Sequence, residues 1–291
     1  MRKFLKIQIM MGKCHFFRKT VLLTLIAVLS APSVNLLAEN SSPDILPGRN
    51  EKLVLNAVGL GAYNVLDEYM SNNVYRGPEL NLAFQRERLL RNSEEWFIVP
   101  YLEVGFSPMN NRNGNGSMLS LMLDWHLSWE RLWISRRNFT LTAGPAFFAK
   151  VGGLYNSRNS NNPAQLKLYA GAALSGEAVY RVNIRNFPLS LSWRADLPLI
   201  GYNFAPTYGL LYYEIGYLGK FGEASHFAWP GNLFALSQRI SVDIPVRKAK
   251  LRLSYLGDYY RYDMGGIRCR MYGNSFMVGV VKKFEIKYNG R

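Results

Sequence analysis

The segment from Ser117 to Arg131, SMLSLMLDWHLSWER, alternates between apolar and polar side chains with a period of two. Leucine or tryptophan stands at every second position from Leu119 to Trp129, and Met118 and Met122 are the only apolar side chains at the positions between. A period of two predicts a β-strand, because a helix would repeat its apolar residues every three or four positions. At roughly 3.3 Å per residue the alternation extends for about 40 Å. Typical strands of soluble sheets have only about five or six residues.

Long alternating strands are typical of transmembrane β-barrels, in which one face meets lipid and closure of the sheet pairs every backbone group. The rest of the chain contains similar segments. We therefore predict an all-β fold, a transmembrane antiparallel up-and-down β-barrel of about ten strands, with eight or twelve strands as alternatives. The expected strands are Leu53–Tyr63, Tyr75–Leu90, Trp96–Phe106, Ser117–Arg131, Phe139–Val151, Gln165–Arg181, Phe187–Leu197, Phe234–Ile244, Leu251–Tyr260 and Phe276–Phe284.

An even number of strands puts both chain termini on the periplasmic side of such a barrel. Several aromatic side chains on the apolar face then lie beside short periplasmic turns, where transmembrane barrels carry an aromatic girdle. These residues are Trp96, Trp129, Phe139, Tyr180, Phe187 and Phe284. Because they share one face and one end of the barrel, they support the predicted register.

The first 38 residues have the pattern of a secretory signal peptide. Basic residues between Arg2 and Lys19 precede an apolar run from Val21 to Leu29, and small residues follow it as far as Ala38. The run is too short to cross a bilayer as a helix. We therefore expect residues 1–38 to be a signal peptide, 39–50 a polar leader and 51–291 a barrel in the outer membrane of a Gram-negative bacterium.

The chain is basic, with 35 Lys and Arg against 20 Asp and Glu, a formal charge of +15 and a mean hydropathy of −0.08. Cleavage after Ala38 removes six basic residues, which leaves 29 against 20, or +9. A basic exported protein is expected to meet lipid phosphates and sugars rather than nucleic acid. The expected partners are outer-membrane lipid and lipopolysaccharide. Only Cys269 would remain after cleavage, so no internal disulfide is expected. We expect a monomer without a metal site or cofactor, because no metal-ligand spacing or nucleotide motif is present.

The alternation stops after Pro198 and resumes near Phe234. We expect a long extracellular loop over about 198–232, in which the run LLYYEIGYL forms an extra hairpin arm or a lid. Aromatic side chains with planar hydrogen-bonding partners are suited to contacts with a glycan or a peptide. The candidates for loop binding are Tyr202, Tyr208, Tyr212, Tyr213, His226 and Trp229. In the alternative interpretation these rings pack on one another and on the barrel rim.

The polar face of the strands carries charges of both signs. We expect these side chains to form a network inside the lumen, because an unpaired buried charge is costly. The predicted members are Glu79, Glu103, Asp124, His126, Glu130, Glu177, Arg194, Asp196, Arg239, Asp243 and Arg252. A ten-stranded barrel is little wider than an eight-stranded one, which its own side chains fill, so an open porin is not expected.

Asp124, His126 and Ser128 lie on this polar face at spacings of two, and Glu130 follows them. Nucleophilic hydrolysis needs a hydroxyl, a base and an orienting carboxylate within hydrogen-bond reach. The His126 and Ser128 pair resembles the His-x-Ser of outer-membrane lipid A deacylases, and Asp124 with His126 resembles the Asp and His pair of ten-stranded outer-membrane proteases. A deacylase site must reach lipid, however, and tryptophan and leucine occupy the lipid-facing positions of this strand. Hydrolysis of lipid A or peptide is therefore an alternative to the lumen network.

Two segments resemble a family of outer-membrane barrels of unknown function from Bacteroides-type bacteria. They are VGLGAYNVLDEYMSNNVYRGPEL, from Val58, and APTYGLLYYEIGYLG, from Ala205. The resemblance covers roughly residues 51–287 and implies a barrel fold and an outer-membrane location, without any activity or functional residue. The predicted function is thus binding by surface loops or narrow, gated passage of a small solute. A hydrolase using His126 and Ser128 and a purely structural membrane protein are the alternatives.

Overall fold

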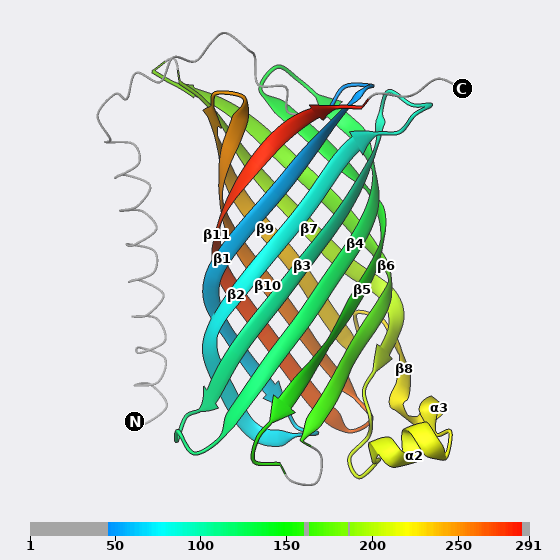
Figure 1. Ribbon diagram of the computed structural model, residues 1–291. Coiled ribbons are helices and arrows are strands. Elements are labelled where there is room, and N and C mark those ends of the chain that lie inside the picture. The colour runs from blue at the N-terminus through cyan, green and yellow to red at the C-terminus, as the bar shows by residue number, and fades with distance from the viewer. Residues whose placement is uncertain (1–45, 160–162, 186, 287–291) are drawn as a thin grey trace, which may run out of the picture. The chain divides into compact units, whose positions relative to one another are not determined.

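The computed structural model describes residues 46–159, 163–185 and 187–286. In these ranges ten long antiparallel strands follow one another around a barrel, and the pairing of β6 with β7 closes the sheet (Figure 1). The predicted ten-stranded up-and-down barrel is confirmed. A short strand, β8, pairs only with the end of β7. The barrel strands are β1 Glu51–Asp67, β2 Ser71–Leu89, β3 Trp96–Asn111, β4 Ser117–Ser135, β5 Phe139–Asn156, β6 Ala164–Ile184, β7 Phe187–Phe204, β9 Leu233–Val246, β10 Ala249–Met264 and β11 Ile267–Glu285.

The two faces of each strand differ as the alternation predicts. On β4 the outward side chains of Leu119, Leu121 and Leu123 are exposed, while the inward side chains of Ser120 and Met122 are buried. An exposed apolar row is unfavourable in water but is the normal outer surface of a barrel in lipid. The two methionines that interrupt the alternation therefore face the barrel interior.

The two ends of the barrel differ in their connections. At one end, called here the terminal end, lie the two ends of the described chain and the short turns β2–β3, β4–β5, β6–β7 and β9–β10. The opposite end, the loop end, carries the longest connection, between β7 and β9 (Figure 1). The predicted girdle lies near the terminal end on the outward face. Phe139 pairs with Tyr180, Lys52 pairs with Phe284, and Ile184 pairs with Phe187.

The long connection contains more regular structure than its sequence indicates. β7 continues past Pro198 as far as Phe204, with a register shift opposite Ala172 and Ala173. Gly171 and Gly201 face each other there, and a Cβ on Gly171 would collide with the carbonyl oxygen of Ile200, so the strands approach closely only because both residues lack side chains.

After this extension come the helices α2 (Tyr212–Tyr217) and α3 (Phe221–Ala224) and the strand β8 (Ser225–Ala228). The prediction of a hairpin arm for LLYYEIGYL was wrong, because most of that run is α2. In the described ranges no helix is long and apolar enough to cross a membrane. The predicted signal peptide lies outside the described residues, as does the leader before Leu46. The last part of the leader, from Leu46 to Asn50, is described, and Leu46 lines a cavity at the terminal end of the lumen.

The orientation of β4 predicts a cost that depends on depth in the membrane. Leu127→Arg should destabilise the folded barrel by about 2 to 4 kcal/mol, because Leu127 pairs with Pro100, about halfway between Trp96 and Phe106 on the outward face. Leu119→Arg makes the same change on the same face close to the loop end and should cost about 0 to 1 kcal/mol. A urea titration of folding into lipid vesicles measures both values. Equal costs would contradict the placement of Leu127 near the midplane.

Candidate functional site

Side chains fill the barrel lumen. Three internal cavities lie along it, with volumes of about 30, 30 and 20 Å³. Each has room for only one or two water molecules, since one water needs a cavity of about 10 to 15 Å³ measured in this way. The described side chains therefore leave no open passage, as the width of a ten-stranded barrel leads one to expect.

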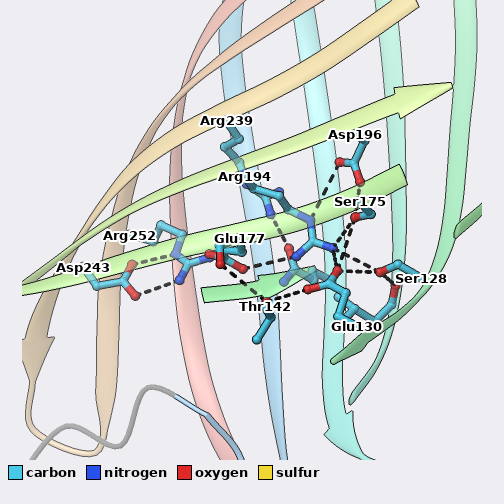
Figure 2. Close-up of polar contacts among 12 residues, drawn as sticks. Ser128, Glu130, Thr142, Ser175, Glu177, Arg194, Asp196, Arg239, Asp243 and Arg252 are labelled. Atoms are coloured by element: carbon cyan, nitrogen blue, oxygen red, sulfur yellow. Dashed lines mark hydrogen bonds and ion pairs between the residues drawn. The ribbon is translucent and has the colours of Figure 1, made fainter. Parts of the chain in front are cut away.

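A buried ion-pair cluster occupies the lumen towards the terminal end (Figure 2). Arg194 from β7 is 4% exposed and lies at its centre. Its guanidinium contacts the carboxylates of Glu130, Glu177 and Asp196, at 3.2 Å for Glu177 and 3.7 Å for Asp196. Each carboxylate comes from an inward position of β4, β6 or β7, so closure of the barrel brings them together. Three acids around one cation leave the cluster with an excess of negative charge.

Hydroxyl groups and a second arginine extend this cluster. Ser175 donates to Asp196 at 2.5 Å, and Thr142 donates to Glu130 at 2.8 Å. Arg252 donates two hydrogen bonds to Asp243, at 2.6 and 2.7 Å, across the pair β9–β10 (Figure 2). Such two-point pairing is the strongest form of arginine–carboxylate contact. The polar groups of the cluster are thus mainly satisfied by one another.

Arg239 does not join an ion pair in the described ranges. It donates to the side-chain oxygen of Gln85 and lies over the ring of Tyr101, with 4.9 Å from the guanidinium carbon to the ring centre. A buried guanidinium over an aromatic face gains electrostatic stabilisation from the ring. Tyr101 in turn donates to Glu103 at 2.6 Å. Arg239 thereby connects the terminal-end cluster to the middle of the lumen.

The middle of the lumen is rich in carboxylates. Lys150 donates to Asp124 at 2.6 Å, and the same lysine borders a cavity with Glu103 and Asp258. Glu79 accepts from Ser275 at 3.1 Å. His126 lies between the rings of Tyr101 and Phe148, and its Nδ1 has no hydrogen-bond partner in the described structure. No group of three or more His, Cys, Asp or Glu side chains in the described residues could hold a metal ion.

The residues proposed for hydrolysis are near each other in sequence but do not form a catalytic group among the described contacts. The Ser128 hydroxyl donates to Glu130 at 2.6 Å and accepts from Arg194 at 3.2 Å. It makes no hydrogen bond with His126, and Asp124 is paired with Lys150. Ser128 is 1% exposed. The geometry therefore offers neither an activated nucleophile nor room for a substrate beside it.

An apolar plug fills the lumen near the loop end. Methionine and tyrosine side chains dominate it, and methionine packs well into irregular spaces. Its larger members are Tyr63, Tyr69, Met70, Tyr75, Met109, Met118, Met122, Phe148, Leu154, Tyr169, Leu233, Tyr260, Tyr262, Met264, Ile267 and Met271. Most of these residues belong to the strands themselves, so the plug is part of the barrel wall.

One ion pair is buried inside this plug. Lys167 from β6 contacts Asp67 at the end of β1, and both side chains are at most 1% exposed. The Lys167 ammonium also donates to the Tyr262 hydroxyl at 3.0 Å and contacts the Cys269 sulfur at 3.5 Å. Cys269 is a free, buried cysteine. A buried lysine needs such compensation, because its charge is costly to remove from water.

The beginning of the long connection covers the mouth of the barrel. The Tyr69 hydroxyl, on the β1–β2 turn, donates to the Leu210 carbonyl at 2.8 Å. Thr207 lies against Gly265 of the β10–β11 turn, and within the connection the His226 ring contacts the Ala205 carbonyl at 3.0 Å. Residues 205–210 thus form a cover over a lumen that the plug already fills.

The rest of the connection presents aromatic side chains to its surroundings. Tyr208 is 83% exposed and Tyr217 is 76% exposed, and the rings of Tyr213 and Tyr217 stack with 5.1 Å between their centres. Trp229 is also exposed. At the start of α2, Glu214 accepts a hydrogen bond from the Leu211 N–H, which together with Lys220 holds the pKa of the Glu214 carboxyl below its usual range.

The structure places the sequence-predicted residues as follows. All predicted lumen residues are inward and buried except Asp124, which is half-buried. Of the loop candidates, Tyr202, Tyr208, Tyr213 and Trp229 are exposed, whereas Tyr212 and His226 are partly buried. Sequence reasoning missed the inward charged residues Asp67, Lys150, Lys167, Lys250 and Asp258. Lys150, Lys167 and Asp258 lie in predicted strands, where alternation carried the same signal, whereas Asp67 and Lys250 lie outside the predicted strands.

The ion-pair cluster predicts a large effect of removing its central cation. Arg194→Met leaves three buried carboxylates without their partner and should destabilise the barrel by about 3 to 5 kcal/mol. Arg88→Met, on the exposed outer face of β2, is the matched control and should change stability by less than about 0.5 kcal/mol. Urea unfolding in vesicles gives both values.

A double variant shows whether Arg194→Met loses stability through the broken ion pair or through lost packing. Adding Glu130→Gln to Arg194→Met should restore part of the lost stability, because it removes one of the uncompensated charges. Equal stability of the Arg194→Met and Arg88→Met proteins would contradict the role assigned to Arg194.

Several solved structures share features of this barrel. The outer membrane protease OmpT from Escherichia coli has 8% identity and a TM-score of 0.48, over 81% of this chain and 97% of that one. The transport unit of the autotransporter AIDA-I from Escherichia coli has 6% identity and a TM-score of 0.44, over 89% and 94%. The translocator domain of the autotransporter NalP from Neisseria meningitidis has 10% identity and a TM-score of 0.40, over 94% and 97%.

No curated protein sequence matches the chain significantly. The origin in Bacteroides-type bacteria stays a prediction. The model of one protein family matches residues 21–290, nearly the whole chain. The chain therefore belongs to the family described as "Protein of unknown function (DUF3316)".

Proposed function

We propose that this protein is a closed outer-membrane barrel that anchors a binding surface for a glycan or peptide, formed by the connection between β7 and β9 at its loop end. The observation that carries the proposal is the combination of a filled lumen with exposed aromatic side chains on that connection. The barrel supplies the anchor, and the connection supplies the contacts.

The outer face supports the placement in a membrane. Trp96 and Phe106 are exposed, outward aromatic residues ten positions apart on β3. At about 3.4 Å per residue and a strand tilt of about 40°, they lie roughly 25 Å apart along the barrel axis. This separation equals the height of the apolar band in outer-membrane barrels, which aromatic girdles flank on both sides. With both termini in the periplasm, the loop end faces outwards.

The filled lumen argues against gated passage of a solute. A lid would have to expose an open path when it moves away from the mouth. Below the cover at residues 205–210, however, lies the plug, to which the strands contribute residues such as Met109, Met118 and Met271. Movement of the cover alone would leave these side chains in place. Binding at the surface is therefore better supported than transport through the barrel.

The exposed rings are suited to recognition. Tyrosine and tryptophan supply a large contact area with little loss of side-chain freedom, and each also has a polar group that can form hydrogen bonds. The connection is folded, since Phe204, Leu210 and Ile215 form a small apolar core beneath α2. A fixed backbone keeps Tyr208, Tyr217 and Trp229 from packing into the barrel.

Binding is tested by removing rings that have no structural contact with the barrel. We expect the double variant Tyr208→Ala and Tyr217→Ala to lose retention on a glycan or peptide array. Loss of one buried aromatic contact typically weakens binding by about tenfold or more. Tyr180→Ala is the control, because Tyr180 is 48% exposed but lies near the terminal end. If the intact protein, the double variant and Tyr180→Ala gave identical array profiles, the proposed binding surface would be wrong.

Conductance tests the alternative of gated passage. Replacing Tyr208–Trp229 by a short Gly-Ser linker should leave the conductance in planar bilayers as low as that of the intact protein, because the plug remains. Replacement of Asn113–Asn115, in the β3–β4 turn at the same end, controls for general damage to the loops. Stable conductance steps that appear only after removal of Tyr208–Trp229 would identify that segment as a lid and contradict the proposal.

A further inference from the structure

An apolar groove runs along the outside of the barrel beneath α2. Its volume is about 860 Å³, within the range of about 300 to 1,000 Å³ that is typical of small-ligand pockets. One wall consists of outward side chains of β3 and β4, namely Phe106, Leu119 and Leu121. The opposite wall is formed by Leu211 and Tyr213 of the α2 segment. The groove is separate from the ion-pair cluster, and its lining includes neither Tyr208 nor Tyr217, although Tyr213 stacks on Tyr217.

Small residues form the floor of this groove. Gly153 on β5 pairs with Leu121 on one side and Leu166 on the other, and its position faces outwards. Ala164 lies beside it across the pair with Tyr155. A Cβ on Gly153 would meet only the Gln165 carbonyl, at 3.6 Å, which is an ordinary contact. The described backbone around Gly153 would accept a Cβ, so the depression in the floor exists because residue 153 has no side chain.

A specific hydrogen bond holds α2 over the groove. Pairing between β6 and β7 begins at Leu168, so the backbone N–H of Leu166 lies beyond the end of β7. This N–H donates to the Tyr212 hydroxyl at 2.7 Å. The Tyr212 ring also contacts Phe204 and Tyr69. The overhang is thus fixed to the wall and can cover a chain that lies in the groove.

The surface that forms this groove is continuous with the lipid-facing surface of the barrel. Leu119 and Leu121 belong to the same outward row as Leu123. At the loop end, the turns that follow β3 and β5 carry Arg112 and Arg158, both exposed and without an ion pair among the described residues. An apolar groove at the loop-side edge of the apolar band, with exposed arginines on the neighbouring turns, matches a lipid that has acyl chains and phosphate groups.

We propose that this groove binds an acyl chain of lipopolysaccharide, with Arg112 and Arg158 next to its phosphates. The inference rests on the orientation given by the proposed function, in which the loop end faces outwards. It does not depend on the glycan or peptide ligand. Lipopolysaccharide fits better than a glycerophospholipid because one molecule combines several acyl chains with phosphates on a sugar.

Gly153→Leu is the decisive variant, because it fills the floor without a backbone clash. The control Ala178→Leu makes a similar change on the outward face of β6, outside the groove. Native mass spectrometry in a mild detergent, with purified lipopolysaccharide as the probe, should detect one tightly held molecule on the intact protein and on the control. Affinity for it should fall by about tenfold in Gly153→Leu, since the displaced chain loses apolar burial. Equal retention by Gly153→Leu would overturn the proposal.

An arginine variant and a second lipid distinguish lipopolysaccharide binding at this groove from ordinary lipid contact. Arg158→Glu should weaken lipopolysaccharide binding, whereas Arg136→Glu, in the β4–β5 turn at the terminal end, should not. Phosphatidylglycerol offered at the same concentration should bind more weakly than lipopolysaccharide. Equal binding of the two lipids would mean ordinary lipid contact and would overturn the assignment. Array binding by Gly153→Leu should stay intact, so failure of one proposal leaves the other testable.

Discussion

Closure of the sheet between β6 and β7 is the constraint on which the rest of the structure depends. Without that pairing the edges of two long strands would expose unpaired backbone groups to lipid, where no water can satisfy them. Closure at ten strands also fixes the width of the lumen. At this width the inward side chains of facing strands meet one another. Most of the described inward residues therefore pack against one another or form polar contacts inside the barrel.

The charges inside the barrel follow from this width. Around Arg194, side chains of β4, β6 and β7 meet in one cluster, and Arg252 pairs with Asp243 nearby. In the middle, Lys150 pairs with Asp124 and lines the same cavity as Asp258. Buried pairs of this kind contribute little net stability compared with apolar packing, but loss of one partner is costly. The pair between Arg194 and Glu130 links two strands across the lumen, and removing either partner would leave an uncompensated buried charge.

The sequence predicts the elements of this fold better than their contacts. A period of two is a local signal, so the ten strands, their outward faces and the girdle near the terminal end could be predicted. Which charges meet across the lumen is not local. Arg194 and Glu130 lie on strands that are not neighbours, and nothing in either strand indicates the pair. The same holds for Lys167 and Asp67, because the curvature of the barrel decides which inward side chains meet.

The long connection between β7 and β9 shows a second limit of structure prediction from the sequence. Its helix α2 has only six residues, Tyr212–Tyr217, too few to show a helical period or to be stable alone. Its position depends on tertiary contacts: Phe204 and Ile215 in a small core and the Tyr212 hydroxyl on Leu166. The extension of β7 past Pro198 could not be predicted either, because proline and glycine are uncommon inside strands.

The same connection links the closed lumen to the outer wall. Through Leu210 it is held to Tyr69 over the mouth, and through Tyr212 it is held to β6 beside the groove. Because α2 is too short to be stable without these contacts, both must be present for the exposed rings to keep their arrangement. An acyl chain in the groove would add a third contact on the membrane side. The contacts with Tyr69 and Leu166 hold the exposed rings without this lipid, so the binding surface does not depend on it and each proposal keeps its own test.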